Sequence, residues 1–267
     1  MLDAFNREIN YLRISVTDRC NLRCTYCMPA EGIQLMRHED VLSFERIAEV
    51  AKVGAENFGI NKIRLTGGEP LARKGLVTLV KLLKAIDGID EINMTTNGIL
   101  LSKYANDLKG AGLNRVNISL DTLSSEKFAQ ITRGGNIQDV FDGIQAAKNA
   151  GLTPIKINVV KMESSDKDEL EDLEEFCIRE DLKIQYIRQM DLKSGTFSQV
   201  EGGNGGNCSI CNRLRLSADG YIKPCLFSNK AYSITENGID GAFAAALGNK
   251  PEKGKKSQNH GFYNIGG

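Results

Sequence analysis

Three cysteines lie close together near the start of the chain, at Cys20, Cys24 and Cys27. Their C-x3-C-x2-C spacing lets the thiolates of one short loop bind three irons of a [4Fe–4S] cluster, because cysteine sulfur holds such clusters. The fourth iron would then be open to a small molecule, like the open position of a catalytic zinc. Structural zinc is the alternative, but it needs a fourth ligand, and neither His38 nor His260 stands at finger-like spacing.

A second set of three cysteines follows much later in the chain, at Cys208, Cys211 and Cys225. The spacing is C-x2-C-x13-C, and no nearby histidine could complete a tetrahedral zinc site. This set therefore predicts a second cluster with one free iron. A zinc ribbon that borrows a carboxylate is the alternative. Cys177 falls on a predicted helix and is expected to be a buried core thiol. An odd number of cysteines at unequal spacings does not indicate a disulfide framework.

Short β-branched runs alternate with longer helical patterns along the first 190 residues. Repeated strand–helix–strand units of this length indicate right-handed parallel crossovers. Six units predict an α/β fold, a partial (β/α)6 TIM-like barrel that stays open. An antiparallel sheet with one solvated face is the alternative. Strands are predicted at 11–17, 61–66, 90–96, 114–120, 154–160 and 183–190, and helices at 43–58, 74–86, 101–110, 138–150 and 166–179.

Each predicted strand has one apolar and one polar face. In the first strand, Leu12 and Ile14 alternate with Arg13 and Ser15. Crossover helices cover the outer face of a parallel sheet, so the apolar side chains should face the helices and the polar ones the concave interior. Closed barrels fill that interior with branched apolar side chains. This interior is therefore predicted to hold something polar.

Composition excludes several classes of protein. The chain has 267 residues, and 34 Lys and Arg residues balance 34 Asp and Glu residues, so no net basic field exists to attract duplex nucleic acid. No segment is apolar and long enough to predict a membrane span, and the opening residues lack a secretory signal, which indicates a cytoplasmic protein. We expect a barrel domain at 1–190, a Gly-rich flexible linker at 191–207 and a cysteine-bearing segment at 208–267.

The motifs together resemble a known family. They are SVTDRCNLRCTYCMP around the first cysteines, LTGGEP at 65–70, TTNG at 95–98, SLD at 119–121, CNRLRLSADGYIKPCLF at 211–227, and a terminal Gly-Gly. In these features the chain resembles the GTP 3′,8-cyclases, radical S-adenosylmethionine (SAM) enzymes of molybdenum cofactor biosynthesis. The resemblance covers most of the chain, and it implies two [4Fe–4S] clusters with SAM as the cofactor.

The resemblance assigns a role to each cysteine set. Cys20, Cys24 and Cys27 would hold the first cluster, whose open iron chelates SAM and whose electron cleaves it to a 5′-deoxyadenosyl radical. Cys208, Cys211 and Cys225 would hold the second cluster, whose free iron orients the purine. The residues that the resemblance implies for cofactor contact are Tyr26, Gly67, Gly68, Glu69, Ser119 and Met190.

The implied reaction abstracts the ribose 3′ hydrogen of GTP and joins C3′ to guanine C8, with Arg213 and Arg215 in catalytic positions. Strand alternation independently places Arg13, Arg64 and Lys156 on the inward face, where buried cations favour an anionic ligand such as a triphosphate. Local pairing with Asp121 or Glu69 is the alternative. The implied substrate contacts are Arg13, Arg64, Thr95, Lys156, Arg188, Arg213, Leu214 and Arg215.

The implied partners are GTP, a one-electron donor of the flavodoxin or ferredoxin type, the downstream cyclic pyranopterin monophosphate synthase, and a second copy in a homodimer. The chain departs from the family in its connection at 191–207, which is much shorter. As a Gly-rich coil these 17 residues would span ~23 Å, enough to cross a barrel mouth but not to rebuild its walls. A radical enzyme for a peptide or another nucleotide, and a non-catalytic metal-binding module, remain alternatives. The terminal Gly266–Gly267 is expected near the cavity.

Overall fold

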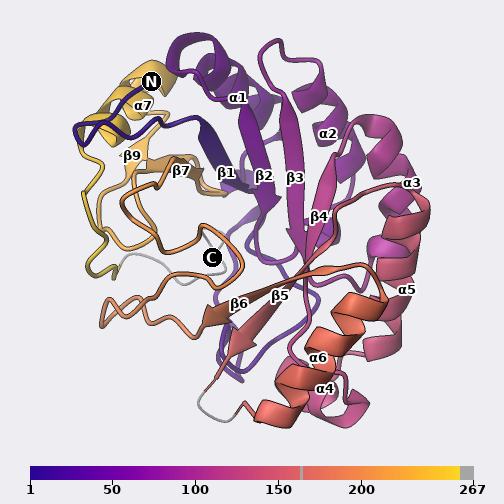
Figure 1. Ribbon diagram of the computed structural model, residues 1–267. Helices are drawn as coiled ribbons and strands as arrows, with labels where there is room; N and C mark the ends of the chain where they lie inside the picture. Colours follow the sequence, from indigo (N-terminus) through magenta and orange to yellow (C-terminus); the bar gives the residue numbers. More distant parts are fainter. Residues whose placement is uncertain (163–164, 259–267) are drawn as a thin grey trace.

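The computed structural model describes residues 1–162 and 165–258. Its strands form one curved sheet in the order β6-β5-β4-β3-β2-β1-β7-β8-β9, which stays open between β6 and β9 (Figure 1). The first six strands are parallel to their neighbours, as predicted for a partial barrel. They are β1 (Tyr11–Ser15), β2 (Lys62–Thr66), β3 (Glu91–Thr96), β4 (Arg115–Ser119), β5 (Lys156–Lys161) and β6 (Lys183–Arg188).

Helices connect these strands and cover the outer face of the sheet (Figure 1). Ser43 begins α1 by accepting a hydrogen bond from the Arg46 amide, and Gly59 ends it with a φ of 70°. Because β1 to β6 pair in parallel, the alternative of an antiparallel sheet is wrong for the barrel strands. The crossover helices are α1 (Phe44–Phe58), α2 (Leu76–Lys84), α3 (Leu101–Ala111), α5 (Ile137–Asn149) and α6 (Lys167–Arg179).

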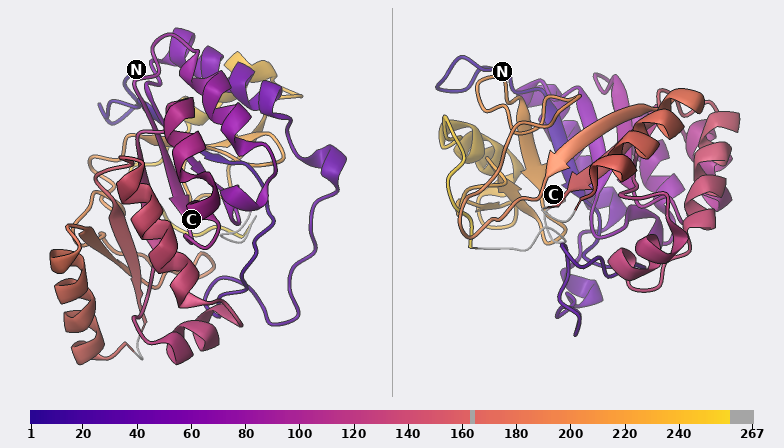
Figure 2. Two further views of the ribbon diagram at one scale, coloured as in Figure 1. Left: turned by 90° about the vertical axis from the view of Figure 1, so that its right-hand side faces the viewer. Right: turned by 60° about the horizontal axis from the view of Figure 1, so that its bottom comes forward.

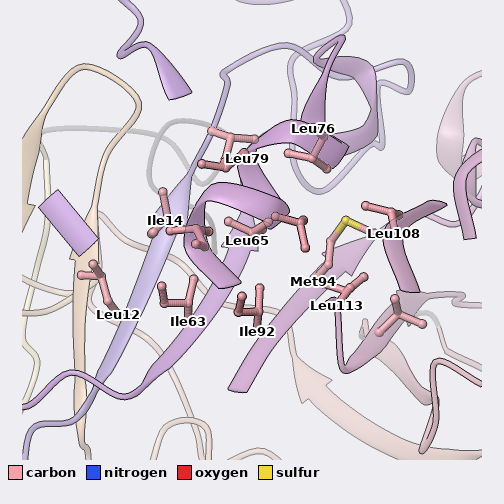
Figure 3. Close-up of a cluster of buried hydrophobic side chains, with 14 of the residues drawn as sticks. Leu12, Ile14, Ile63, Leu65, Leu76, Leu79, Ile92, Met94, Leu108 and Leu113 are labelled. Atoms are coloured by element: carbon pink, nitrogen blue, oxygen red, sulfur yellow. The ribbon is translucent and has the colours of Figure 1, made fainter. Parts of the chain in front are cut away.

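The hydrophobic core lies between the sheet and these helices. Leu12, Ile14, Ile63 and Leu65 are fully buried on the outer face, as the alternation predicted. Figure 3 shows them together with Leu79 of α2. Cys177 of α6 is also buried in this core, which confirms the prediction of a structural thiol.

Several elements were not predicted. A short helix, α4 (Ser125–Thr132), precedes α5, and the cysteine-bearing segment continues the barrel sheet. There β7 (Arg213–Leu216) pairs in parallel with β1, while β8 (Tyr221–Lys223) and β9 (Tyr232–Ser233) are antiparallel, and α7 (Gly238–Gly248) packs on α1. The sequence did not predict these strands because two to four residues are too few to show alternation. The pairing of β1 with β7 also joins residues about 200 positions apart.

The connection at 191–207 makes defined contacts along β6, where we expected a flexible linker. Glu201 pairs with Tyr186 in an isolated bridge and forms an ion pair with Lys161 at 2.8 Å. Asp191 bridges to Thr196. These contacts cover part of an edge strand whose backbone groups would otherwise face solvent.

Candidate active site

The carboxyl ends of the parallel strands surround a cavity of about 220 Å³. Ligands of open α/β sheets bind at this edge. The first cysteine set lies on the loop that follows β1. Later in the same connection, the stretch with the short helix His38–Asp40 projects from the body of the molecule (Figure 2). The cavity is lined by Cys20, Cys24 and Cys27 and by eight other residues predicted for cofactor or substrate contact: Tyr26, Gly67, Gly68, Glu69, Thr95, Ser119, Arg188 and Met190.

The glycine pair after β2 fixes the start of the cysteine loop. The Gly68 amide donates to the Thr17 carbonyl and the Glu69 amide to the Arg19 carbonyl, both at 2.8 Å. A Cβ atom on Gly68 would lie 2.4 Å from the Arg19 carbonyl oxygen. We expected these glycines to let the backbone approach a ligand, and both line the cavity. At position 68, however, a side chain is excluded by the backbone of Arg19 and not by a ligand.

Glu69 joins the ends of β2 and β3. Its carboxylate accepts hydrogen bonds from the Leu71 amide (3.0 Å), the Thr96 hydroxyl (2.8 Å) and the Asn97 amide (2.7 Å). Burial raises the pKa of Glu69 to about 7. Because both oxygens already accept hydrogen bonds, Glu69 holds the cavity wall in place.

Tyr26 joins the cysteine loop to the far side of the cavity. Its hydroxyl donates to Asp121 at 2.7 Å, and the other oxygen of Asp121 accepts from the Val160 amide at 2.7 Å. Burial raises the pKa of Asp121. Sequence reasoning treated Asp121 only as an alternative ion-pair partner, although its place in the SLD motif after β4 could have indicated a site residue.

The three thiols of the first set converge. A turn from the Cys27 amide to the Cys24 carbonyl (3.0 Å) closes the loop, and the pKa of Cys24 responds to the charges of Cys20 and Cys27. Burial raises the pKa of Cys20 to about 11 and that of Cys24 to about 12, so these thiols are protonated at neutral pH until a cation favours the thiolate.

The donor set fits an iron–sulfur cluster. Three thiols face the cavity from one loop, a set that suits iron and sulfide, and each cysteine of a cluster binds a different iron. In the described ranges no three His, Cys, Asp or Glu side chains surround the position of one metal ion.

The second cysteine set lies beside β7 and β8. The Cys211 amide donates to the Cys208 carbonyl at 3.3 Å. Burial raises the pKa of Cys225, and the nearby Cys211 thiolate acts in the same direction. Burial opposes ionisation of Cys211, but the nearby Lys250 ammonium lowers the pKa of that thiol below its usual value. Thus Cys211 and Cys225 are neighbours, and Cys208 is tied to Cys211 by a tight turn.

The two cysteine sets lie at opposite ends of the β1–β7 pair. The first set follows the carboxyl end of β1, whereas Cys208 and Cys211 precede the amino end of the parallel β7. Cys225 follows the antiparallel β8 and so returns to that same end. Five residues of strand span about 16 Å, which leaves the inner face of the sheet between the sets.

A row of cations occupies that inner face. Arg64, Arg13 and Arg215 are register partners on β2, β1 and β7, and Lys223 of β8 is the register partner of Arg215. Burial lowers the pKa of Arg13 well below its usual value and that of Arg215 to about 10, and the neighbouring cations act in the same direction. We call these four residues the cation row.

Arg64 and Lys156 have no carboxylate partner in the described parts of the chain. Arg64 is 7% exposed and donates to the Tyr11 hydroxyl and to Thr95 at 3.2 Å. Lys156 is partly buried, and burial together with the charges of Arg115 and Arg64 lowers its pKa. The alternative of pairing with Asp121 or Glu69 is therefore not observed for these two cations.

Other predicted residues lie apart from the row. Leu214 is fully buried with the outer-face core, so its side chain points away from Arg213 and Arg215. Arg213 is partly buried and donates to the Asn204 carbonyl at 3.0 Å. Arg188, at the end of β6, is exposed and lines the cysteine cavity.

Sequence reasoning missed Tyr11, Lys223 and Asn97. Tyr11 stands two residues before Arg13 on the same strand face, so alternation could have found it. Lys223 is fully buried, and its ammonium has no hydrogen-bond partner among the described residues. Burial lowers its pKa to about 8. Asn97 lines the cysteine cavity beside Cys20, and its TTNG motif was the available signal.

Two further expectations concern the C-terminal residues and membrane spans. Gly266–Gly267 and His260 lie outside the described residues. Within the described residues, no helix combines the length and the apolar character needed to cross a membrane.

Comparison with known proteins gives consistent matches. The Radical SAM superfamily matches residues 14–177. The GTP 3′,8-cyclase of Thermodesulfovibrio yellowstonii is 45% identical over 88% of this chain and 87% of its own, and that of Moorella thermoacetica is 43% identical over 94% of both. The GTP 3′,8-cyclase of Alkaliphilus oremlandii is 39% identical over the whole of both chains. That alignment has 321 positions, more than the 267 residues here, so the relative has segments that this chain lacks.

Solved structures share the fold. Streptococcus suis SuiB bound to S-adenosylmethionine superposes with a TM-score of 0.66 at 15% identity, over 94% of this chain and 66% of its own. Methylornithine synthase (PylB) gives a TM-score of 0.58 at 17% identity, over 76% of this chain and 61% of its own. With the first cysteine loop at the strand edge and identities of 39 to 45% over most of its length, the chain belongs to the GTP 3′,8-cyclase family of the radical SAM superfamily.

Proposed function

We propose that this chain converts GTP to (8S)-3′,8-cyclo-7,8-dihydroguanosine 5′-triphosphate in molybdenum cofactor biosynthesis. The observation that carries the proposal is the cation row between two three-cysteine sets at opposite ends of β1 and β7. A nucleoside triphosphate has an anionic triphosphate that could bind to the cation row and a base that could reach the second cysteine set.

The first site would bind the cofactor. Cys20, Cys24 and Cys27 would hold a [4Fe–4S] cluster, which supplies the electron that cleaves S-adenosylmethionine to a 5′-deoxyadenosyl radical. Tyr26 positions the cysteine loop through Asp121. The cofactor would occupy the cavity, in contact with Tyr26, Gly67, Gly68, Glu69, Ser119 and Met190.

The substrate site would lie on the inner face of the sheet. Arg13, Arg64 and Arg215 would bind the triphosphate, since guanidinium groups offer paired donors to phosphate oxygens. Lys156, Thr95 and Arg188 would approach it from neighbouring strands, and Arg213 with the Leu214 backbone from β7. Cys208, Cys211 and Cys225 would hold a second [4Fe–4S] cluster facing the purine. The anionic substrate would relieve repulsion among cations that burial has already destabilised.

The remaining partners and the domain division follow from the family likeness. We propose a flavodoxin or ferredoxin as the electron donor, cyclic pyranopterin monophosphate synthase as the next enzyme, and a homodimer. We also propose that residues 1–190 form the SAM-binding part and 208–267 the second-cluster part, although one sheet runs through both.

The test is an anaerobic incubation of reconstituted protein with S-adenosylmethionine, dithionite and one nucleoside triphosphate at a time. We expect the cyclised product, identified by mass, from GTP alone. Cys24→Ser should abolish it, and Cys177→Ser, a change of the buried core thiol, should not. Cyclisation of another nucleotide, or cofactor cleavage that responds only to a peptide, would refute the assignment of GTP. Reconstitution with zinc alone would indicate a metal-binding module.

A further inference from the structure

Two buried cations lie behind the second cysteine set. Lys250 follows α7 and is 4% exposed, and Arg7, in the N-terminal segment, is 7% exposed. Figure 1 shows the N-terminal segment passing beside α7. The two residues are far apart in sequence and neither belongs to the cation row. Their contacts converge on the cysteines.

Lys250 holds both cysteine-bearing segments with one ammonium. Its Nζ donates to the Arg213 carbonyl at 2.6 Å and to the Pro224 carbonyl at 2.8 Å, and it lies 3.5 Å from the Cys211 Sγ. Arg213 follows Cys211 by two residues, and Pro224 directly precedes Cys225. An ammonium has three donors, and here each has an acceptor. One of these acceptors is the sulfur of a proposed cluster ligand.

Arg7 ties the remaining cysteine to the same place. Its Nη1 donates to the Cys208 carbonyl at 2.8 Å and to the Glu252 carbonyl at 3.0 Å, and its Nη2 donates to the Pro251 carbonyl at 2.8 Å. The 250–252 segment is thus fixed to Cys208 by Arg7 and to Cys211 by Lys250. Together the two cations contact Cys208, Cys211 and the residue that precedes Cys225.

Charge separates the roles of the two residues. Arg7 forms an ion pair with the buried Asp3 carboxylate at 2.6 Å, so its charge is compensated locally. Lys250 forms no ion pair with a carboxylate within the described ranges. A buried cation without a counter-charge is costly, and the nearest groups that can become anionic are the thiols of Cys211 and Cys225. The ammonium is therefore placed to compensate thiolate charge.

We propose that Lys250 is a positioning residue for the second cluster, fixing the segments of Cys211 and Cys225 and donating a hydrogen bond to the Cys211 sulfur that raises the reduction potential of the cluster. The inference rests on the proposed second cluster. Hydrogen bonds to cluster sulfurs and nearby charges are among the factors that set such potentials. A residue with a purely structural role would need the contacts to the Arg213 and Pro224 carbonyls but not the contact to the Cys211 sulfur.

The test compares Lys250→Met, Lys250→Arg and Lys253→Met in the full two-cluster protein. Lys253 is an exposed lysine three residues away and serves as the matched control. The reduction potentials are measured by redox titration followed by electron paramagnetic resonance, and S-adenosylmethionine identifies the first cluster because it perturbs that signal. Transfer of iron to a chelator gives a second readout that does not depend on activity.

In Lys250→Met we expect a lower potential for the second cluster and at least a tenfold faster loss of its iron. The first cluster and uncoupled cofactor cleavage should stay as in the wild type. Lys250→Arg, which keeps the charge, should recover most of the potential, and Lys253→Met should change nothing. An unchanged second-cluster potential and chelation rate, or loss of both clusters together in Lys250→Met, would overturn the inference.

The wild-type measurement separates this inference from the proposed function. A wild-type chain that binds only the first cluster would refute the second cluster and this role of Lys250 together. A wild-type enzyme with two clusters and cyclase activity, but with a second cluster indifferent to Lys250, would refute the inference alone.

Discussion

Replacing Arg64 with Ala should weaken GTP binding without unfolding the protein. Arg64 is the register partner of Arg13 on the inner face of the sheet and has no carboxylate partner in the described ranges. Its guanidinium is held by Tyr11 and Thr95, so it is oriented before any ligand arrives. A preformed donor of this kind contributes to binding at little cost in side-chain entropy.

The expected magnitude follows from the chemistry of the contact. Loss of a hydrogen bond to a charged group costs about 1 to 3 kcal/mol, or roughly a 5- to 150-fold increase in Kd. The free energy of unfolding should change little, because the lost bonds to Tyr11 and Thr95 are offset by weaker repulsion on Arg13, whose pKa burial and neighbouring cations already lower.

Anaerobic titration calorimetry without S-adenosylmethionine measures the affinity for GTP and for guanosine. We expect Arg64→Ala to weaken GTP binding and to leave guanosine binding unchanged, because only GTP carries the phosphates. Arg179→Ala, a change of an exposed arginine on α6, removes the same charge from the outer face and should alter neither affinity. Unchanged GTP affinity in Arg64→Ala, Arg13→Ala and Lys156→Ala would refute the role of the inner-face cations.

Three further outcomes are expected. Iron analysis of reconstituted protein should give about eight irons per chain. Cys24→Ser should stop cofactor cleavage, whereas Cys208→Ser should spare uncoupled cleavage and impair cyclisation. Loss of uncoupled cleavage in Cys208→Ser would contradict these separate roles of the two clusters. Tyr26→Phe should lower the free energy of unfolding by about 1 to 3 kcal/mol in urea titrations, because Asp121 loses a partly buried hydrogen bond. An unchanged midpoint would show that this bond is dispensable. Burial raises the pKa of Glu69 to about 7, so the folded apoprotein binds more protons than the unfolded chain between about pH 4.5 and 7, and its stability should fall by up to about 1.4 kcal/mol per pH unit as the pH rises through that range. Glu69→Gln should flatten that slope, and an equal slope in both proteins would refute the assignment.

The sequence sufficed to predict the barrel because the strands are long enough to show alternation. Leu12 and Arg13 on β1 already separate a helix-facing side from an inner side, and the structure retains that separation. The first cysteine motif could likewise be placed at the end of its strand. In both cases the information lies within about ten consecutive residues.

The parts that could not be predicted depend on contacts between distant residues. Local alternation in β7 separates Leu214 from Arg215, but nothing local shows that β7 joins β1 and extends the barrel sheet. Lys223 became a member of the cation row only through its register with Arg215. The contact between Lys250 and Cys211 likewise joins two segments whose separation in sequence hides their proximity.

The β1–β7 pairing also explains how one sheet can serve two cysteine sets. Parallel pairing sends the loop after β1 to one end of the strands and the loop before β7 to the other, so the sets cannot meet. The interval of about 16 Å between them is set by the length of β1. Within it, Arg13 and Arg215 are brought side by side by backbone hydrogen bonds that do not depend on their charges. The sheet therefore holds the repulsive cations together before a ligand binds, and an anion placed there gains their combined attraction without ordering them first.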